Sequence, residues 1–536
     1  MKNLRYRIGL VVEGDRVPKW VRDLALWANR HGEMELSALI VAPPPARRGL
    51  VGRLLALERF LLRFSAAYRP YARLYSLAGL APVELRATRS DGGSVRLGDA
   101  DLERLEALRL DILVQCGSAA PAPRLAAAAR DGFLFLSAGS GGAASDGARG
   151  IAEVIEGAPE TRFAIERFAP SSAGPETLFA GSISTALGYG ATMVALHARA
   201  FGYIRLVLER LAAGTAAPGR HDRGLAVPRP VAAGDVGTYA LRTARRSAGK
   251  AARRLLGREF NWSVGFTRQS WTDGDWASGV SIPNPPGTFL ADPFTIAERG
   301  TNYVLVEEFP FSTRKGVISA YAVEGEAARR IGPVLERPYH LSFPFLFRHG
   351  GDIFMVPESG ADRSVRLYRS SSFPTGWEEV RVLLSGVAAV DTILFEHHGR
   401  WWMLTTIKGE GPAINSAELH AFHAPDPLGE WTPHRNNPVV MDARRGRNGG
   451  FVRDCDGRPH RVAQIPGFTF YGAGAAIYRI DELSPESYSE RLVREIGPGF
   501  MAGLDGTHHV HSADGLTVYD FMRVERPARR PKGVSE

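Results

Sequence analysis

Five β-hairpins recur about every fifty residues in the second half of the chain. Each hairpin joins two short apolar runs through a polar turn, and the turns read AERGTN, HGGD, HHGR, DCDGR and SADG. A regular repeat of this period is typical of a propeller with one four-stranded sheet per repeat. We therefore predict a five-bladed, all-β propeller over residues 261–530. The paired runs are 294–296 with 303–307, 345–348 with 353–357, 393–396 with 401–405, 450–453 with 459–463, and 508–511 with 516–520.

The first 213 residues follow a different pattern, in which compact apolar runs alternate with segments of helical spacing. This alternation favours an α/β domain with a Rossmann-type parallel sheet covered by helices. The chain is therefore predicted to be multidomain, with an α/β domain followed by the propeller. The predicted strands are 6–12, 36–41, 111–116 and 132–137, and the clearest helix is 17–30.

Residues 214–260 form a seam between the two domains that is rich in Ala, Gly, Pro and Arg. Seven basic residues and no acid lie between Arg242 and Arg258. One interpretation is a solvated linker with a short basic helix. The other is a surface for an anionic phospholipid or a phosphorylated carrier lipid.

The composition excludes two classes of protein and indicates which kinds of partner the chain could bind. The apolar share of 44% excludes a disordered chain, and two cysteines among 536 residues exclude a disulfide scaffold. The formal charge of +9 would suit nucleic acid, an anionic membrane or phosphorylated substrates. Because the densest positive run lies in the seam, we favour a phosphate-bearing or lipid-linked partner and predict no nucleic acid.

The N-terminal apolar run, 8–12, is too short for a signal peptide, and a spanning helix needs roughly 20 apolar residues. The nearest candidate, 191–213, carries five titratable side chains, three of them arginines. We therefore expect a cytoplasmic protein, with peripheral contact at the inner membrane face through residues 242–258 as the alternative.

Two acids precede hairpins at equivalent places, Asp292 before the first and Asp391 before the third. The innermost strand of each blade begins near the central channel, so these carboxylates would converge on one axial pocket. Paired carboxylates are the usual machinery for breaking glycosidic bonds. Each acid taken alone could equally be a turn or strand-cap residue. The HHVH run at 508–511 could hold a metal, but we expect its histidines to bind sugar hydroxyls or an acid, and we predict no metal and no cofactor.

Several motifs in this half carry a family resemblance. The stretch resembles the five-bladed propellers of arabinanases, xylosidases and related glycoside hydrolases. It is more similar to the N-terminal domain of plant glucosamine inositolphosphorylceramide transferases, in which a separate domain resembles known transferases. The same kind of domain is found in many bacterial surface-polysaccharide proteins. The motifs are ADPF at 291–294, EEF at 307–309, KGVI at 315–318, HLSFP at 340–344, VPES at 356–359, VDT at 390–392 and the arginine pair 444–445.

The resemblance to arabinanases implies roles for individual residues. It makes Asp292 the base or nucleophile and Asp391 a group that tunes pKa or orients the substrate. The general acid expected in the fourth blade is missing, because residues 445–450 read RGRNGG. We predict that Glu358 replaces it. Arg445 and Arg447 are predicted to neutralise an anionic leaving group, since guanidinium binds phosphate in a bidentate manner. The other predicted substrate-binding residues are Glu307, Glu308, Lys315, His340 and His508.

Residues 6–205 resemble the formyltransferase domain of folate-dependent enzymes, through LDILVQCG at 110–117 and GFLFLSAGS at 132–140. Phe135, Ser137 and Ala173 stand where that family has its catalytic Asn, His and Asp. Without a base, formyl transfer has no proton acceptor. We therefore interpret this domain as inactive and retained for docking, carrier binding or dimerisation.

Together these features predict a carbohydrate-active protein. The first hypothesis is glycosyl transfer in surface polysaccharide or glycolipid biosynthesis, from a nucleotide- or lipid-linked sugar donor to a glycan acceptor. The alternatives are a glycoside hydrolase that uses the same pocket and a non-catalytic scaffold that binds glycans.

Overall fold

The computed structural model separates the chain into two compact units, one made mainly of residues 1–247 and the other mainly of residues 248–536. The boundary falls inside the basic seam, which forms a long helix at that point. The residues that the structure describes are 5–44, 50–89, 94–117, 125, 127–138, 150–170, 172, 174–215, 233–272, 274, 276–409 and 418–525.

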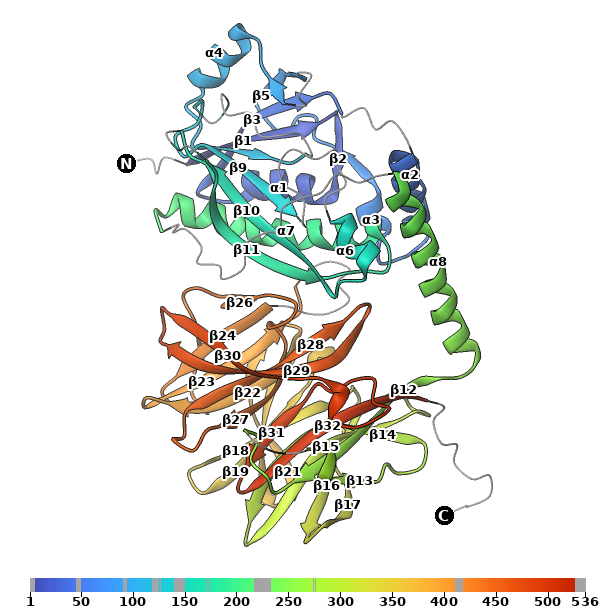
Figure 1. Ribbon diagram of the computed structural model, residues 1–536. Helices are drawn as coiled ribbons and strands as arrows, with labels where there is room; N and C mark the ends of the chain where they lie inside the picture. The colour runs from blue at the N-terminus through green and yellow to red at the C-terminus, as the bar shows by residue number, and fades with distance from the viewer. Residues whose placement is uncertain are drawn as a thin grey trace. The chain divides into compact units, whose positions relative to one another are not determined.

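The first unit is built on a sheet of seven described strands in the order β11-β10-β9-β8-β1-β3-β5 (Figure 1). The five strands from β9 to β5 run parallel, whereas β10 and β11 add to one edge in antiparallel pairs. The sheet is therefore mixed, and the prediction of a parallel sheet is wrong at that edge. Its strands are β1 (Tyr6–Glu13), β3 (Met34–Ala42), β5 (Val83–Arg86), β8 (Ile112–Gln115), β9 (Phe133–Ala138), β10 (Glu160–Phe168) and β11 (Glu176–Ser184).

Helices cover this sheet because their apolar residues recur on one face. In α1 the buried side chains are Trp20, Val21, Leu24, Ala25 and Ala28, which is the spacing of an amphipathic helix. The described helices are α1 (Lys19–Arg30), α2 (Leu50–Leu62), α3 (Arg69–Ala72), α4 (Asp99–Ala107), α6 (Ile151–Glu156), α7 (Tyr189–Ala212) and α8 (Ala233–Leu255). Two small sheets pair β2 (Arg16–Pro18) with β4 (Leu74–Ser76) and β6 (Thr88–Arg89) with β7 (Val95–Arg96).

Helix α7 is long and apolar enough to cross a membrane, with a mean hydropathy of 1.2 over its most apolar window. However, 56% of that window is buried inside the protein, where α7 packs against α1, α2, β10 and β11. These contacts are those of a core helix in an α/β unit.

The second unit consists of five antiparallel sheets among the described residues (Figure 1), so the predicted five-bladed propeller is confirmed. The first blade consists of β14 (Thr288–Glu298), β15 (Thr301–Pro310), β16 (Val317–Glu324) and β17 (Ala327–Leu335). The second consists of β18 (Ser342–His349), β19 (Asp352–Glu358), β20 (Ser364–Ser372) and β21 (Thr375–Ser385). The third blade consists of β22 (Ala389–His397), β23 (Arg400–Ile407), β24 (Glu418–Ala424) and β25 (Thr432–Pro433), and β26 (Val440–Met441) also pairs with β24. The fourth consists of β27 (Asn448–Arg453), β28 (Pro459–Gly467), β29 (Phe470–Leu483) and β30 (Tyr488–Ile496).

The fifth blade joins the two ends of the propeller. Its strands lie in the order β13 (Val280–Ile282), β12 (Glu259–Thr267), β32 (Leu516–Glu525) and β31 (Val510–Ala513). Trp262 on β12 pairs with Met522 on β32, so the first and last strands of the ring share one sheet. This pairing leaves no open edge between the ends of the ring.

A β-bulge recurs near the start of the innermost strand in four blades. The register shifts between residues 291 and 294, 342 and 345, 390 and 393, and 448 and 451. At the first three bulges Asp292, Phe343 and Asp391 adopt left-handed backbone, with φ of 50°, 47° and 51°. A bulge turns a side chain out of the ladder. The two acids predicted from the sequence therefore occupy the same structural position in blades one and three.

Candidate active site

A pocket of about 480 Å³ lies in the second unit, where the bulges and the second strands of several blades meet. Its polar lining includes three acids, Asp292, Glu307 and Glu358. Aromatic side chains, three arginines and a fourth acid, Glu259, complete the wall. The remaining lining residues are Arg258, Glu259, Phe260, Trp262, Phe289, Ala291, Phe309, Phe311, Arg314, His340, Ser342, Arg447, Tyr471 and His508.

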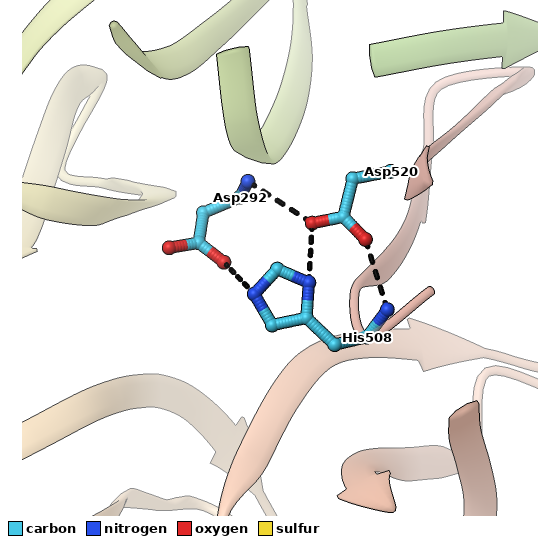
Figure 2. Close-up of side chains that lie close together, drawn as sticks. All are labelled: Asp292, His508 and Asp520. Atoms are coloured by element: carbon cyan, nitrogen blue, oxygen red, sulfur yellow. Dashed lines mark hydrogen bonds and ion pairs between the residues drawn. The ribbon is translucent and has the colours of Figure 1, made fainter. Parts of the chain in front are cut away.

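Asp292 belongs to a buried chain of three titratable groups (Figure 2). His508 Nε2 lies 3.4 Å from Asp292 Oδ1, and His508 Nδ1 lies 2.6 Å from Asp520 Oδ2. The backbone N–H groups of His508 and His509 both donate to Asp520 Oδ1, at 2.9 and 3.0 Å. Asp520 is fully buried and so fixed behind the imidazole. His508 is thereby oriented toward Asp292, which faces the pocket.

Within this group of three residues, the pKa values of the two that face the pocket, Asp292 and His508, are both raised. Burial raises the pKa of Asp292 to about 7, and His508 opposes that rise. Burial disfavours the charged imidazole of His508, but the carboxylates of Asp520 and Asp292 outweigh it and raise its pKa. His508 is therefore shifted toward its protonated form and stands beside a carboxyl that can ionise near neutral pH.

Glu307 and Glu358 occupy equivalent places in consecutive blades. Glu307 on β15 pairs with Ala291, and Glu358 on β19 pairs with Ser342, just before the bulge in each case. Burial and the nearby Asp391 raise the pKa of Glu358 to about 8. Burial also raises the pKa of Glu307 well above its usual range, and Asp292 adds to the effect. Both glutamates are thus shifted toward the protonated form, in which a carboxyl can act as a proton donor.

Asp391 is fully buried and is absent from the pocket lining. Its Oδ2 accepts a hydrogen bond of 2.6 Å from Arg447 Nε, and its backbone oxygen accepts one of 2.7 Å from Asn448. Arg447 does line the pocket, where its guanidinium lies over the ring of Tyr471 at 5.2 Å. Asp391 therefore reaches the pocket through the arginine it holds.

His340 lines the pocket beside Glu307. Its Nδ1 accepts a hydrogen bond of 2.9 Å from the backbone N–H of Gly316. Burial lowers its pKa, so the neutral ring carries its proton on Nε2, which lies 3.5 Å from Glu307 Oε1. A Cβ on Gly316 would lie 2.9 Å from Glu307 Oε1 and 2.8 Å from the His340 ring, so glycine is required for this close approach.

Three predicted substrate-binding residues do not line the pocket. Glu308 points to the opposite face of β15, because side chains alternate along a strand, and it binds Arg330 at 2.9 and 3.0 Å. Lys315 is turned toward Glu336 and the Arg337 carbonyl, at 2.9 and 3.0 Å.

Arg445 is the third. It lies 3.7 Å from the buried carboxylate of Glu490, and its guanidinium stands over the ring of Tyr478 at 5.7 Å. Arg445 and Arg447, two positions apart in the sequence, thus have different acidic partners. The predicted pair of arginines around a leaving group is not formed. Of the two, Arg447 reaches the pocket, and its charge is matched by Asp391.

Sequence reasoning missed the aromatic residues and Asp520. Trp262 packs against the His508 ring, with centroids 4.1 Å apart, and Tyr471 lies 5.6 Å from the same ring. Phe289 stacks on Phe309 at 4.7 Å in the pocket wall. Asp520 is the last residue of the predicted strand 516–520, which pairs with the histidine run 508–511. That pairing places Asp520 opposite the histidines and could have identified it from the sequence.

The histidine run divides between two faces. His509 and His511 pack against Phe294, at 4.6 and 4.8 Å, whereas His508 faces the pocket. Asp292, His508 and Asp520 each offer one ligand atom within 4.8 Å of the others, a donor set that could hold a metal ion. The expectation of no metal stays a prediction.

In the first unit, two of the three positions that correspond to formyltransferase catalytic residues are described, and both side chains pack or bond within the unit. Phe135 is buried and stacks on Phe168 at 5.4 Å, and the Ser137 hydroxyl donates to Glu166. Ala173 lies outside the described residues. The formyltransferase resemblance stays a prediction.

Residues 277–497 match the family described as glucosamine inositolphosphorylceramide transferase 1, N-terminal. The chain is 31% identical over 259 residues to glucosamine inositolphosphorylceramide transferase 1 of Arabidopsis thaliana. The aligned region covers 43% of this chain and 34% of the plant protein. The protein of the same name from Oryza sativa subsp. japonica is 31% identical over 258 residues, 47% of this chain and 34% of its own. The chain thus spans about a third of the length of these relatives. The resemblance predicted for the propeller is confirmed.

Solved structures similar to this chain include a family 117 glycoside hydrolase of Zobellia galactanivorans, at 12% identity and a TM-score of 0.29, covering 52% of this chain and 96% of that one. Another is the native arabinanase of Bacillus subtilis, at 14% identity and a TM-score of 0.25, covering 33% of this chain and 64% of that one. The catalytic domain of a Coprinopsis cinerea family 62 α-L-arabinofuranosidase has 10% identity and a TM-score of 0.32, covering 46% and 86%.

Proposed function

We propose that the second unit is a carbohydrate-active domain and that the protein transfers a sugar in surface polysaccharide or glycolipid biosynthesis. The observation that carries this proposal is the presence of Asp292 and Glu358 in one pocket, with pKa values near 7 and 8. Acids and bases that titrate near neutral pH are typical of catalytic pairs. The 31% identity with named transferases over this region supports a carbohydrate-active domain.

In the proposed reaction Glu358 donates its proton to the leaving oxygen as the donor's glycosidic C–O bond breaks. Asp292 accepts the proton of the acceptor hydroxyl as the new C–O bond forms. His508, whose pKa the neighbouring carboxylates raise, stabilises the ionised form of Asp292 before the transfer. Asp391 is a positioning residue that acts through Arg447. Glu307 and His340 are placed to bind sugar hydroxyls.

A glycoside hydrolase using the same residues is the second candidate, and the state of the arginines favours it. Arg447 already pairs with Asp391, and Arg445 lies away from the pocket beside Glu490. The other arginines that line the pocket are Arg258 and Arg314, and Arg314 lies 3.8 Å from the carboxylate of Glu259. A phosphate leaving group would thus compete with an acid for two of the three arginines. A neutral glycoside needs no such cation, because Glu358 supplies the proton.

We also propose a nucleotide- or lipid-linked sugar donor, a glycan acceptor and peripheral contact with the cytoplasmic face of a membrane through residues 242–258. Leu255 and Leu256 at the end of α8 have exposed fractions of 87% and 51%. Arg258 and Phe260, which follow them, line the pocket. An anionic, lipid-linked donor bound at this end of α8 would present its sugar to the pocket.

The test compares the wild type with Asp292→Asn and Glu358→Gln. The control is Glu336→Gln, a surface change outside the pocket. Each is assayed with nucleotide sugars, lipid-linked sugars, and aryl glycosides with poor and good leaving groups. Asp292→Asn is expected to slow every active substrate by about 10²–10⁴-fold. Glu358→Gln should slow poor leaving groups to the same degree and good ones much less, because a good leaving group departs unprotonated.

Product analysis separates the candidates. A new glycosidic bond indicates transfer, and release of free sugar indicates hydrolysis. Equal turnover by wild type and Asp292→Asn contradicts the site. Glycan binding without turnover in every protein assigns the pocket to a non-catalytic scaffold.

A further inference from the structure

Helix α2 of the first unit presents an apolar face to solvent. Leu57, Phe60, Leu61 and Phe64 have exposed fractions of 53%, 51%, 55% and 70%. Their spacing of three, four and seven residues places them on one side of the helix and the turn that follows it. The rings of Phe60 and Phe64 meet edge to face at 5.3 Å, so the two form a continuous apolar surface.

The opposite side of α2 is anchored to the protein. The Glu58 carboxylate accepts a hydrogen bond of 2.6 Å from the backbone N–H of Gly190 and another from the hydroxyl of Tyr239 on α8. Leu62 lies close to Gly190 at the start of α7, where a Cβ would be 3.4 Å from its Cδ1. Figure 1 shows α2 beside α8 in this unit. The exposed face is therefore a fixed feature of a docked helix.

The charge around this face is strongly positive. Among the described side chains from residue 56 to residue 83 there are four arginines and a single acid, Glu58. Glu58 is occupied by the anchoring contacts. Arg63, Arg69 and Arg73 are exposed. The exposed charged side chains that flank the apolar residues along this described segment are therefore cations.

We propose that this α2 face, formed by Leu57, Phe60, Leu61 and Phe64, lies in the interface of an anionic phospholipid bilayer. Apolar residues on one side flanked by arginines are the pattern of an interfacial helix, in which the apolar groups enter the acyl boundary and the cations meet phosphate. A second copy of this chain fits less well, because its arginines would oppose those of the first. The residues of this face are different from those that line the pocket and from residues 242–258.

The experiment measures sedimentation of the full chain with vesicles of phosphatidylcholine alone or of equal parts phosphatidylcholine and phosphatidylglycerol. Wild type is compared with Phe60→Ser/Phe64→Ser and with Arg63→Gln/Arg69→Gln. The control Leu492→Ser/Val493→Ser removes two exposed apolar residues of β30 instead. Circular dichroism checks that each variant is folded, and light scattering reports its oligomeric state.

Wild type and the control should bind the anionic vesicles and leave the neutral ones, with binding reduced by added salt. The phenylalanine variant should bind at least about tenfold more weakly, because two apolar side chains no longer leave water. The arginine variant should lose about fivefold per charge. Equal binding to both vesicle types, no binding, or unchanged binding by the phenylalanine variant would overturn the proposal. A wild-type dimer that the phenylalanine change dissociates, with vesicle binding intact, would assign the face to a second copy.

Discussion

Asp292 and Glu358 differ in what surrounds them, and this difference separates their roles. Asp292 has His508 at 3.4 Å, a group that favours its ionised form. Glu358 is buried near Asp391, a charge that favours its protonated form. Burial raises both pKa values, to about 7 for Asp292 and about 8 for Glu358, so the imidazole beside Asp292 is the feature that assigns it the role of base.

The pH dependence follows with a definite sign. Asp292 must be ionised to accept a proton, so kcat/KM should rise as pH passes about 7. Glu358 must be protonated, so kcat/KM should fall as pH passes about 8. His508→Gln removes a charge that lowers the pKa of Asp292, and the acid limb should move to higher pH. A pH profile of kcat/KM on an active aryl glycoside measures both limbs.

His340→Gln serves as the control for that profile, since His340 contacts Glu307 and leaves Asp292 unaffected. It should alter KM and leave the acid limb in place. An acid limb that stays fixed in His508→Gln would contradict the role given to the imidazole.

At the scale of elements, the bulges decide where the site forms. They place Asp292 and Asp391 at matching positions, but the neighbours differ, so one acid faces the pocket and the other holds Arg447. In the fourth blade the bulge contains Gly450, with φ of 121°. Its missing side chain leaves room for the fifth blade to close against it.

We expect Gly450→Ala to destabilise the propeller by about 3 kcal/mol. A Cβ there would lie 2.0 Å from the carbonyl oxygen of Val510, and the backbone conformation suits glycine alone. Gly515→Ala is the matched control, because its φ is also positive at 75° but open space surrounds it. It should cost roughly 1–2 kcal/mol. Urea unfolding measures both, and equal losses would contradict the steric explanation.

The inner hairpins were predictable because each is local, with an alternating pattern and its own turn. The closing pair β12 and β32 was not, since its strands lie at opposite ends of the propeller sequence. The same limit applies to the site. Asp292 and Glu358, predicted from their motifs, line the pocket, whereas Glu308 and Arg445 do not. Glu308 lies one position along the strand from Glu307 and faces the other way, and Arg445 is held by Glu490, a residue distant in sequence.

For the whole molecule, the division into two units separates two proposed tasks. Every pocket-lining residue falls between Arg258 and His508, and the ring closes between 259 and 525. The exposed face of α2 belongs to the first unit. Chemistry and the α2 membrane contact should therefore be separable by cutting the chain.

A fragment of residues 256–525 is expected to fold, because it retains all five blades and the closing pair. It should hydrolyse or transfer a soluble aryl glycoside within about threefold of the full chain and should lose the vesicle binding due to α2. A shorter fragment, 256–509, lacks β31, β32 and Asp520, so it should fail to unfold cooperatively and should have no activity. Circular dichroism melting and kcat/KM are the measurements. If fragment 256–525 is folded but inactive, the first unit must contribute to the reaction, and the assignment of the chemistry to the propeller alone would be wrong.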